Sequence, residues 1–335
     1  MLMLKRISLI CVLFCLVISL PAQDLRFHHG QFKIVQFTDL HYQQDNPASQ
    51  QAAECIKEVV KSERPDLIVV TGDIVYSQPG KVALQTVLDI FKDTKTPFCM
   101  LFGNHDPGEG TPLDTLYNMM QAAPYSVQPH RESALFDYTL PVKSEDGSKT
   151  EAVIYGMDTH DYSKIKGTGT YQEFFPEQVN WYRKTSADYA LENGGKPLPA
   201  VAFMHYPLPE YNYAMTNPEI IMNGTRMETG CSSDLNSGMF DAMKQCGDIM
   251  GVFCGHDHDN DCSMMYYGIL LAYGRFSGGN TEYNHLRNGG RVIVLKEGSR
   301  SFDTWIHERG GQVLNRTSYP ASYTKDNWKE RKGTR

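Results

Sequence analysis

Short apolar runs alternate with amphipathic stretches through the region from about residue 30 to residue 105. The runs Lys33–Thr38, Asp66–Thr71 and Pro97–Phe102 are too short for helices and rich in β-branched or aromatic residues, so they predict buried strands. Between them, Ala52–Lys61 and Val82–Phe91 repeat apolar residues at helical spacing. This alternation of strands and helices indicates a layered α/β unit.

The same pattern continues into the second half of the chain. Three more apolar runs predict strands: Ala152–Gly156, Ala200–Met204 and Ile249–Cys254. A helix is predicted at Glu177–Leu191 among them. After Gly255 the runs become shorter and are separated by glycines, and we expect them to be antiparallel strands that complete a second sheet: Met264–Tyr273, Arg291–Leu295 and Phe302–Ile306.

The N-terminus has the pattern of a signal peptide. Lys5 and Arg6 precede an apolar run, Ile7–Leu20, and the small residue Ala22 offers a cleavage site. An uncleaved anchor helix is the alternative, but the run is shorter than the roughly 20 residues that span a bilayer. We therefore expect a signal peptide in residues 1–22, one domain in residues 23–318 and a polar C-terminal tail in residues 319–335. Cleavage would leave an exported protein, periplasmic or extracellular, with no stable membrane span.

Composition narrows the function classes. The chain has 335 residues, of which 41% are hydrophobic and 21% charged, an ordinary globular balance. Its formal charge of −7, which becomes −9 without Lys5 and Arg6, argues against a non-specific nucleic-acid binder. The six cysteines after residue 22 contain no C-x-x-C spacing, so a zinc ribbon is not supported. Cys99 and Cys254 lie inside predicted strands, and we expect both to be buried.

Polar residues with metal-ligand chemistry follow the predicted strands. They form five short motifs: Asp39-Leu40-His41, Gly72-Asp73, Gly103-Asn104-His105-Asp106, His205, and Gly255-His256-Asp257-His258. The carboxyl ends of parallel strands share one edge of a sheet, so we expect these residues to meet in one crevice. Carboxylates, imidazoles and an amide oxygen together suit Zn, Mn or Fe and contain too much nitrogen for a calcium site.

Each motif taken alone is a weak signal. A histidine that closes an apolar run, such as His205, is more often a core residue than a ligand. A carboxylate at a strand end, such as Asp73, is often only a turn residue. The ordered combination of all five motifs at strand ends is what favours a metal centre.

The motif order D-x-H, G-D, G-N-H-[DE], H and G-H-x-H resembles the calcineurin-like metallophosphoesterases. The resemblance runs from Phe32 to Trp305, and Glu228–Asp261 is similar to the purple-acid-phosphatase-like branch that carries D-x-H in its first motif. It implies an α/β (α+β) fold, a two-sheet β-sandwich flanked by helices. It also implies a dinuclear-metal phosphoester hydrolase that uses a metal-bridging hydroxide.

The resemblance also assigns roles to residues. The first metal would be held by Asp39, His41, Asp73 and His258. The second would share Asp73 and add Asn104, His205 and His256. His105 would be a catalytic group without a metal role, oriented by Asp106, and Asn104 and His105 would contact the substrate.

Two assignments stay open on the residues alone. Purple enzymes bind Fe(III) through a tyrosine in G-D-x-x-Y and lack the D-x-H histidine, whereas this chain has both Tyr76 and His41. We interpret His41 as the ligand and Tyr76 as a packing residue. Arg275 is a candidate phosphate clamp, with a solvated surface arginine as the alternative. Further candidates for the pocket are Asp158, His160, Asp161, Tyr206, Glu210, Glu228 and Asn260.

These observations predict a phosphatase acting on small phosphomonoesters, with diesters as a second substrate class. A phosphodiesterase acting on nucleotides or lipid head groups is the alternative within the same chemistry. A catalytically silent metal-binding module is the alternative from another class. A metallopeptidase is disfavoured because the sequence lacks H-E-x-x-H. The sequence indicates no specific nucleic-acid partner and leaves the substrate, the oligomeric state and the disulfide pairing open.

Overall fold

The computed structural model describes residues 24–131 and 135–324. The predicted signal peptide, residues 1–22, lies outside these described residues, and so does the predicted tail from residue 325 onward. Among the helices of the described residues, none combines the length and the hydrophobicity that a membrane span requires.

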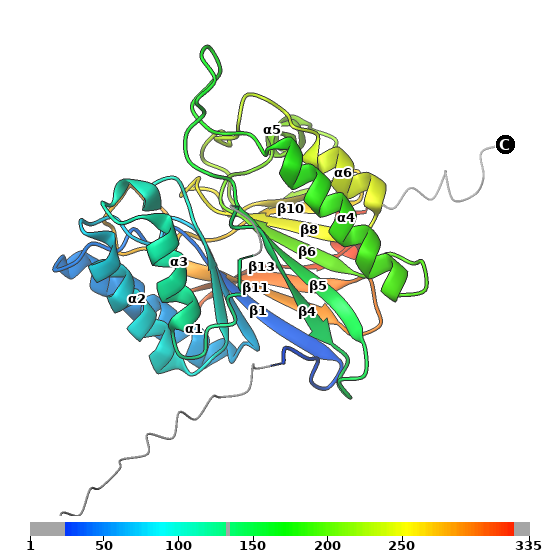
Figure 1. The fold of residues 1–335 in the computed structure, drawn as a ribbon, viewed down its shortest axis with the longest axis horizontal. Helices are drawn as coiled ribbons and strands as arrows, with labels where there is room; N and C mark the ends of the chain where they lie inside the picture. The colour runs from blue at the N-terminus through cyan, green and yellow to red at the C-terminus, as the bar shows by residue number, and fades with distance from the viewer. Residues whose placement is uncertain (1–23, 132–134, 325–335) are drawn as a thin grey trace, which may run out of the picture.

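Two β-sheets packed face to face form the centre of the molecule (Figure 1). The first sheet has the strand order β13 (Val313–Tyr319), β12 (Phe302–Glu308), β11 (Gly289–Lys296), β1 (Gln31–Phe37), β2 (Leu67–Thr71) and β3 (Phe98–Leu101). The second has the order β4 (Tyr138–Lys143), β5 (Thr150–Met157), β6 (Ala200–Met204), β8 (Ile249–Cys254), β10 (Ile269–Tyr273), β9 (Ser263–Tyr266) and β7 (Met222–Asn223).

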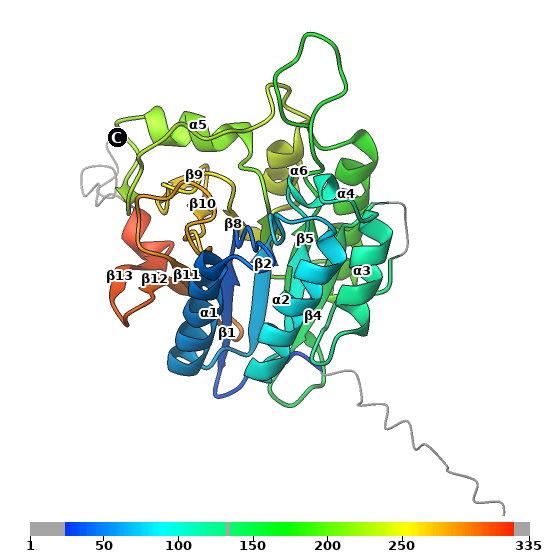
Figure 2. The same ribbon diagram turned by 90° about the vertical axis from the view of Figure 1, so that its left-hand side faces the viewer.

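Helices cover the outer faces of both sheets. On one side of the sandwich lie α1 (Gln50–Glu63), α2 (Gly80–Thr94) and α3 (Leu113–Ala122). On the other side lie α4 (Pro176–Glu192) and α6 (Met239–Cys246). The remaining helix, α5 (Pro209–Thr216), lies at the end of the molecule toward which β1 points (Figure 2). The predicted two-sheet sandwich flanked by helices is therefore confirmed.

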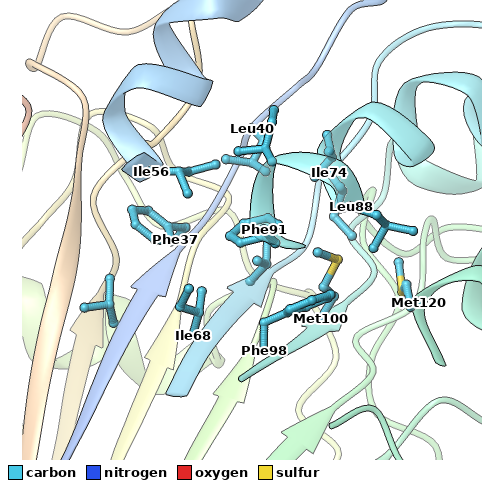
Figure 3. Packing of buried hydrophobic residues seen from close by; sticks show 14 of the residues in the cluster. Phe37, Leu40, Ile56, Ile68, Ile74, Leu88, Phe91, Phe98, Met100 and Met120 are labelled. Atoms are coloured by element: carbon cyan, nitrogen blue, oxygen red, sulfur yellow. The ribbon is translucent and has the colours of Figure 1, made fainter. Parts of the chain in front are cut away.

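Three hydrophobic layers hold these elements together. In the layer under α1 and α2, Ile56 and Phe91 pack against Phe37 and Ile68 of the first sheet (Figure 3). A second layer fills the space between the two sheets, and a third lies under α4 and α6. Because each sheet is covered on both faces, its central strands are apolar on both faces. This explains why the sequence shows continuous apolar runs instead of alternation.

Strand β1 shows this arrangement residue by residue. Phe32 and Ile34 point into the layer between the sheets, whereas Val35 and Phe37 point toward the helices. Strands β1, β2 and β3 are parallel, and so are β5, β6, β8 and β10. The two parallel blocks thus supply several strand ends for polar loops. Cys99 and Cys254 are both fully buried, as predicted.

The expected position of the late strands is wrong for two of them. Strand β11 pairs antiparallel with β1, and β12 pairs with β11, so both extend the first sheet. Of the strands predicted after Gly255, β9 and β10 join the second sheet, where β10 runs parallel to β8. The apolar strand β1 needs a partner on each side, and β2 supplies only one. The apolar runs in the sequence identified β11 and β12 as strands, but they did not show that β11 pairs with the free side of β1 in the first sheet.

The packed domain also extends beyond residue 318. Tyr319 is the last residue of β13, and Tyr323 is buried. The Tyr323 hydroxyl lies 2.7 Å from Ser263 Oγ and from Thr317 Oγ1. The predicted tail therefore begins with residues that are part of the fold.

Candidate metal centre

The strand-end motifs meet where the two parallel blocks end. Ligand-type side chains fall into two groups in which the atoms lie within 4.8 Å of one another: Asp39, His41 and His258 in one, and Asp73, His205 and His256 in the other. Five of the six residues are buried, and the His256 side chain is largely buried. Each group combines residues that follow strands of both sheets, so the centre sits across the interface between them.

Sharp backbone turns aim these side chains back over the strand ends. Four of the residues have positive φ angles although they are not glycine: Asp39 at 53°, His41 at 39°, Asp73 at 48° and His256 at 73°. Such conformations cost about 1–3 kcal/mol each and persist where the surroundings enforce them. The Asp39 N–H donates to the Gly72 carbonyl (3.1 Å) and the His41 N–H to the Asp73 carbonyl (2.9 Å), which fixes the first two turns to each other.

Two motif glycines are required by close approach. A β-carbon on Gly103 would collide with the Asp73 carboxylate, and one on Gly255 would collide with the side chains of Thr38 and Asp39. Any larger residue at either position would push a carboxylate out of place. The glycines of the G-N-H-D and G-H-D-H motifs therefore make room for the ligands.

The Asp73 carboxylate occupies the middle of the centre. Its Oδ2 lies 3.5 Å from His41 Nε2 in one group and 3.3 Å from His205 Nε2 in the other. Its Oδ1 accepts the backbone N–H of His105 at 2.9 Å, which fixes the orientation of the carboxylate. Oδ2 is thus in the position of a ligand that two cations share.

The donor set fits two cations. His205 Nδ1 lies 2.8 Å from the Thr71 carbonyl, which only accepts, so in the neutral imidazole Nδ1 carries the hydrogen and Nε2 presents a lone pair. That lone pair faces the Asn104 amide oxygen at 3.1 Å. In the other group, His258 Nδ1 donates to the Tyr283 carbonyl (2.8 Å), and His258 Nε2 faces His41 Nε2 at 3.2 Å. Converging lone pairs repel one another unless positive charge lies between them.

The pKa shifts of the histidines also indicate that the buried carboxylates require positive charge nearby. Burial disfavours a charged His205, but Asp73 and then Asp39 outweigh that cost and raise the pKa of His205 to about 10. Burial is also the main reason why the pKa of His41 falls to about 3, and Asp73 opposes that fall only in part. Without metal, a proton on His205 therefore partly replaces the positive charge that the carboxylates require.

His105 lies beside the two groups and belongs to neither. Its side chain is 33% exposed, and its Nε2 is 4.0 Å from Asp73 Oδ2. Tyr76 packs edge-on against His41 and His105, with ring centroids 5.5 Å and 5.1 Å away. The charge of Glu282, followed by burial, raises the pKa of Tyr76. The Tyr76 ring thus packs against the centre, and the His41 side chain belongs to one of the two ligand-type groups.

Asp106 has a different role from the predicted one. Its carboxylate is 1% exposed and accepts three backbone N–H groups, from Ile74 (2.9 Å), Val75 (3.0 Å) and Gly103 (2.8 Å). These bonds join the loop after β2 to the loop after β3. Because both oxygens are engaged by backbone amides, Asp106 holds the loops that carry Asp73 and Asn104 and does not orient the His105 ring.

Arg275 is neither a phosphate clamp nor a surface residue. It is 2% exposed, and its Nη2 pairs with Asp261 Oδ2 (2.8 Å) and Glu308 Oε1 (3.2 Å). A buried guanidinium needs such partners because an unpaired buried charge is costly. Because Arg275 is buried and paired with these two carboxylates, it is not available to bind a substrate.

The other pocket candidates differ in how close they come to the ligands. The Tyr206 ring packs against His205 and His256, with centroids 5.3 Å and 4.7 Å away. Glu228 accepts the Tyr283 hydroxyl (3.0 Å), and Tyr283 stacks on His258. The others make hydrogen bonds with the loops and helices around the centre: Asp158, His160, Asp161, Glu210 and Asn260.

Sequence reasoning missed three tyrosines that contact the ligand-type residues. Tyr162 accepts a hydrogen bond from Asn104 Nδ2 at 3.0 Å. Tyr171 packs edge-on against His256 at 4.6 Å, and Tyr283 stacks on His258 at 4.4 Å. Tyrosines in irregular loops have no periodicity that would place them. The histidines could be identified because they directly follow predicted strands, and only a position of that kind could have identified these tyrosines.

Comparisons with known proteins agree with this geometry. The sequence profile described as calcineurin-like phosphoesterase matches residues 32–260. Two relatives from Arabidopsis thaliana, named "Probable inactive purple acid phosphatase 14" and "29", are each 30% identical to the chain. The first match covers 75% of this chain and 72% of the relative, and the second covers 88% and 85%.

A solved structure shares the fold. The dimetal phosphatase from Danio rerio superimposes with a TM-score of 0.59 at 12% sequence identity, covering 86% of this chain and 98% of that chain. At this identity the likeness concerns the fold alone. The profile match covers more than half of the chain, and the ligand-type residues of its motifs meet at one place in the structure. The chain therefore belongs to the calcineurin-like phosphoesterase family.

Proposed function

We propose that the protein is a two-metal phosphoester hydrolase that acts on small phosphomonoesters outside the cytoplasm. The observation that carries this proposal is the position of Asp73 Oδ2 between two groups of ligand-type atoms. A carboxylate in this position would hold two cations close together, as phosphoryl transfer by paired metals requires. Membership of the phosphoesterase family supports the same reaction class.

The two sites would be filled by divalent or trivalent transition metals, with Fe, Mn and Zn as the candidates. One set of ligands comprises Asp39, His41, Asp73 and His258, and the other comprises Asp73, Asn104, His205 and His256. When bound, the metals supply Lewis acidity toward phosphoryl oxygens and activate the attacking water.

The protein's own residues prepare this chemistry. The buried Asp106 carboxylate fixes the loops that carry Asp73 and Asn104. His105, partly exposed beside Asp73, can donate a proton to the leaving-group oxygen as the ester bond breaks. His105 is held in place through its backbone N–H, which bonds to Asp73, so its ring remains free for this transfer.

A catalytically silent metal-binding module is the second candidate. The names of the Arabidopsis relatives, which include the word "inactive", favour it. The residues of this chain argue for activity, because the sequence contains all seven predicted ligands and His105, and glycines stand where a larger residue would collide with a carboxylate. A silent module would need only the metals and not a partly exposed imidazole beside them.

Metal analysis combined with turnover tests the proposal. We expect up to two transition metals per chain and hydrolysis of a chromogenic phosphomonoester in excess of a chromogenic diester. Asp73→Asn should lose both metals and the activity, because the shared charge disappears. The control Asp89→Asn changes an exposed carboxylate on α2 and should retain both.

Each outcome has a definite meaning. Full metal content and activity in Asp73→Asn would overturn the shared-ligand assignment. A fully loaded protein that turns over neither ester would establish the silent module. A preference for the diester would move the protein to the phosphodiesterase class.

A further inference from the structure

The Asn104 side chain connects the metal centre to an exposed tyrosine. Its Oδ1 faces His205 Nε2 at 3.1 Å on the metal side, and its Nδ2 lies 3.0 Å from the Tyr162 hydroxyl on the other side. An amide NH2 group can only donate, so the Tyr162 oxygen must be the acceptor in this bond. The direction of the bond leaves the hydrogen of the Tyr162 hydroxyl available for another acceptor.

That hydrogen has no acceptor among the described residues, where the bond from Asn104 is the single hydrogen bond of the Tyr162 hydroxyl. Two other tyrosines around the centre use their hydroxyl hydrogens within the protein. Tyr206 donates to the Asp161 carbonyl (2.6 Å), and Tyr283 donates to Glu228 (3.0 Å). Tyr162 is 43% exposed, and the bond from Asn104 keeps its hydroxyl beside the metal centre.

The ring that carries this group is held in position. Tyr162 forms an antiparallel backbone bridge with Tyr171, and the two rings stack with centroids 6.2 Å apart. Tyr171 in turn packs edge-on against the ligand-type residue His256. The carbonyl of the preceding residue, Asp161, accepts the Tyr206 hydroxyl. A donor fixed in this way loses little entropy when it binds a substrate.

We propose that Tyr162 is a catalytic residue that donates a hydrogen bond from its hydroxyl to a non-bridging oxygen of the bound phosphoryl group. The inference rests on the proposed function and adds a contact that Arg275, paired inside the fold, cannot make. Asn104 would bind metal through its oxygen and hold Tyr162 through its nitrogen, so one side chain aligns the donor with the metal centre. A donor aimed at an oxygen that gains charge stabilises the transition state more than the ground state.

Replacement of the hydroxyl alone provides the test. Tyr162→Phe keeps the ring that stacks on Tyr171 and removes only the O–H group. Inorganic phosphate is the probe, titrated calorimetrically into metal-loaded protein. A hydrogen bond to a charged acceptor is worth enough that its loss should weaken phosphate binding roughly 10-fold. Metal content should stay unchanged, and kcat should fall by a similar factor for aryl and alkyl phosphates.

Tyr213→Phe is the matched control, since Tyr213 is an exposed tyrosine on α5 and its hydroxyl makes no hydrogen bond among the described residues. It should bind phosphate as the unaltered protein does. A Tyr162→Phe protein that binds phosphate with unchanged affinity would overturn the inference while the proposed function stands. Loss of metal from Tyr162→Phe would also overturn it, because Tyr162 would then only support Asn104.

Two further outcomes separate this inference from the proposed function. A rate loss that is much larger for alkyl than for aryl phosphates would place the hydroxyl at the leaving group and refute the contact proposed here. If the unaltered, metal-loaded protein neither binds phosphate nor hydrolyses any ester, the proposed function itself fails and the role of Tyr162 fails with it.

Discussion

Asp106→Ala should destabilise the protein strongly, although Asp106 touches no ligand-type side chain through its own carboxylate. The substitution leaves the N–H groups of Ile74, Val75 and Gly103 without their acceptor in a buried setting. Each unpaired buried donor costs about 1–3 kcal/mol. Because water can enter part of the space left by the carboxylate, we expect the lower half of the summed range, about 3–6 kcal/mol.

Denaturant unfolding of the metal-free protein, in the presence of a chelator, measures this loss without a contribution from metal binding. Asp188→Ala, which removes an exposed i,i+4 partner of Lys184 on α4, is the control and should cost less than about 1 kcal/mol. A loss below about 1 kcal/mol for Asp106→Ala would refute the reasoning, because three buried donors cannot lose their acceptor so cheaply. It would mean that the loops rearrange and find other acceptors.

Two more predictions concern catalysis and export. His105→Ala should keep both metals but lose turnover by about 10²–10⁴-fold. The loss should be larger for an alkyl phosphate than for an activated aryl phosphate, because the aryl leaving group needs less protonation. Loss of metal would instead make His105 a ligand or the support of one. Mature protein isolated from outside the cytoplasm should begin near Gln23 by N-terminal sequencing, as expected for cleavage after Ala22; intact Met1 on protein from the cytoplasm would contradict export.

The parts of the fold that the sequence predicted are those with a strong local signal. Strand β8 spans Ile249–Cys254 and β6 spans Ala200–Met204, both as predicted, because continuous apolar runs end abruptly at polar motifs. Strand β13, Val313–Tyr319, went unnoticed because it is an edge strand whose residues are mostly half-buried or exposed. Its sequence therefore lacks both an apolar run and clear alternation.

The candidate site shows the same division. Residues that end strands could be gathered from the sequence, because parallel strands deliver their ends to a common edge. Asp106 and Arg275 were placed wrongly because side-chain direction depends on what packs nearby. Asp106 turns to three backbone amides, and Arg275 turns to Asp261 and Glu308, which lie far away in the sequence. Long-range pairing of this kind leaves no local pattern.

Because each group of ligand-type residues contains residues that follow strands of both sheets, a bound metal ion would cross-link the two sheets of the sandwich. Asp39 follows β1 of the first sheet, whereas His258 follows β8 of the second. Asp73 and His205 repeat this arrangement in the other group. Any ion that binds only the folded state stabilises it in proportion to the logarithm of its concentration. The unfolding temperature of the protein should therefore rise with the concentration of free metal. The same increase in bound metal would raise thermal stability and the fraction of catalytically competent protein together.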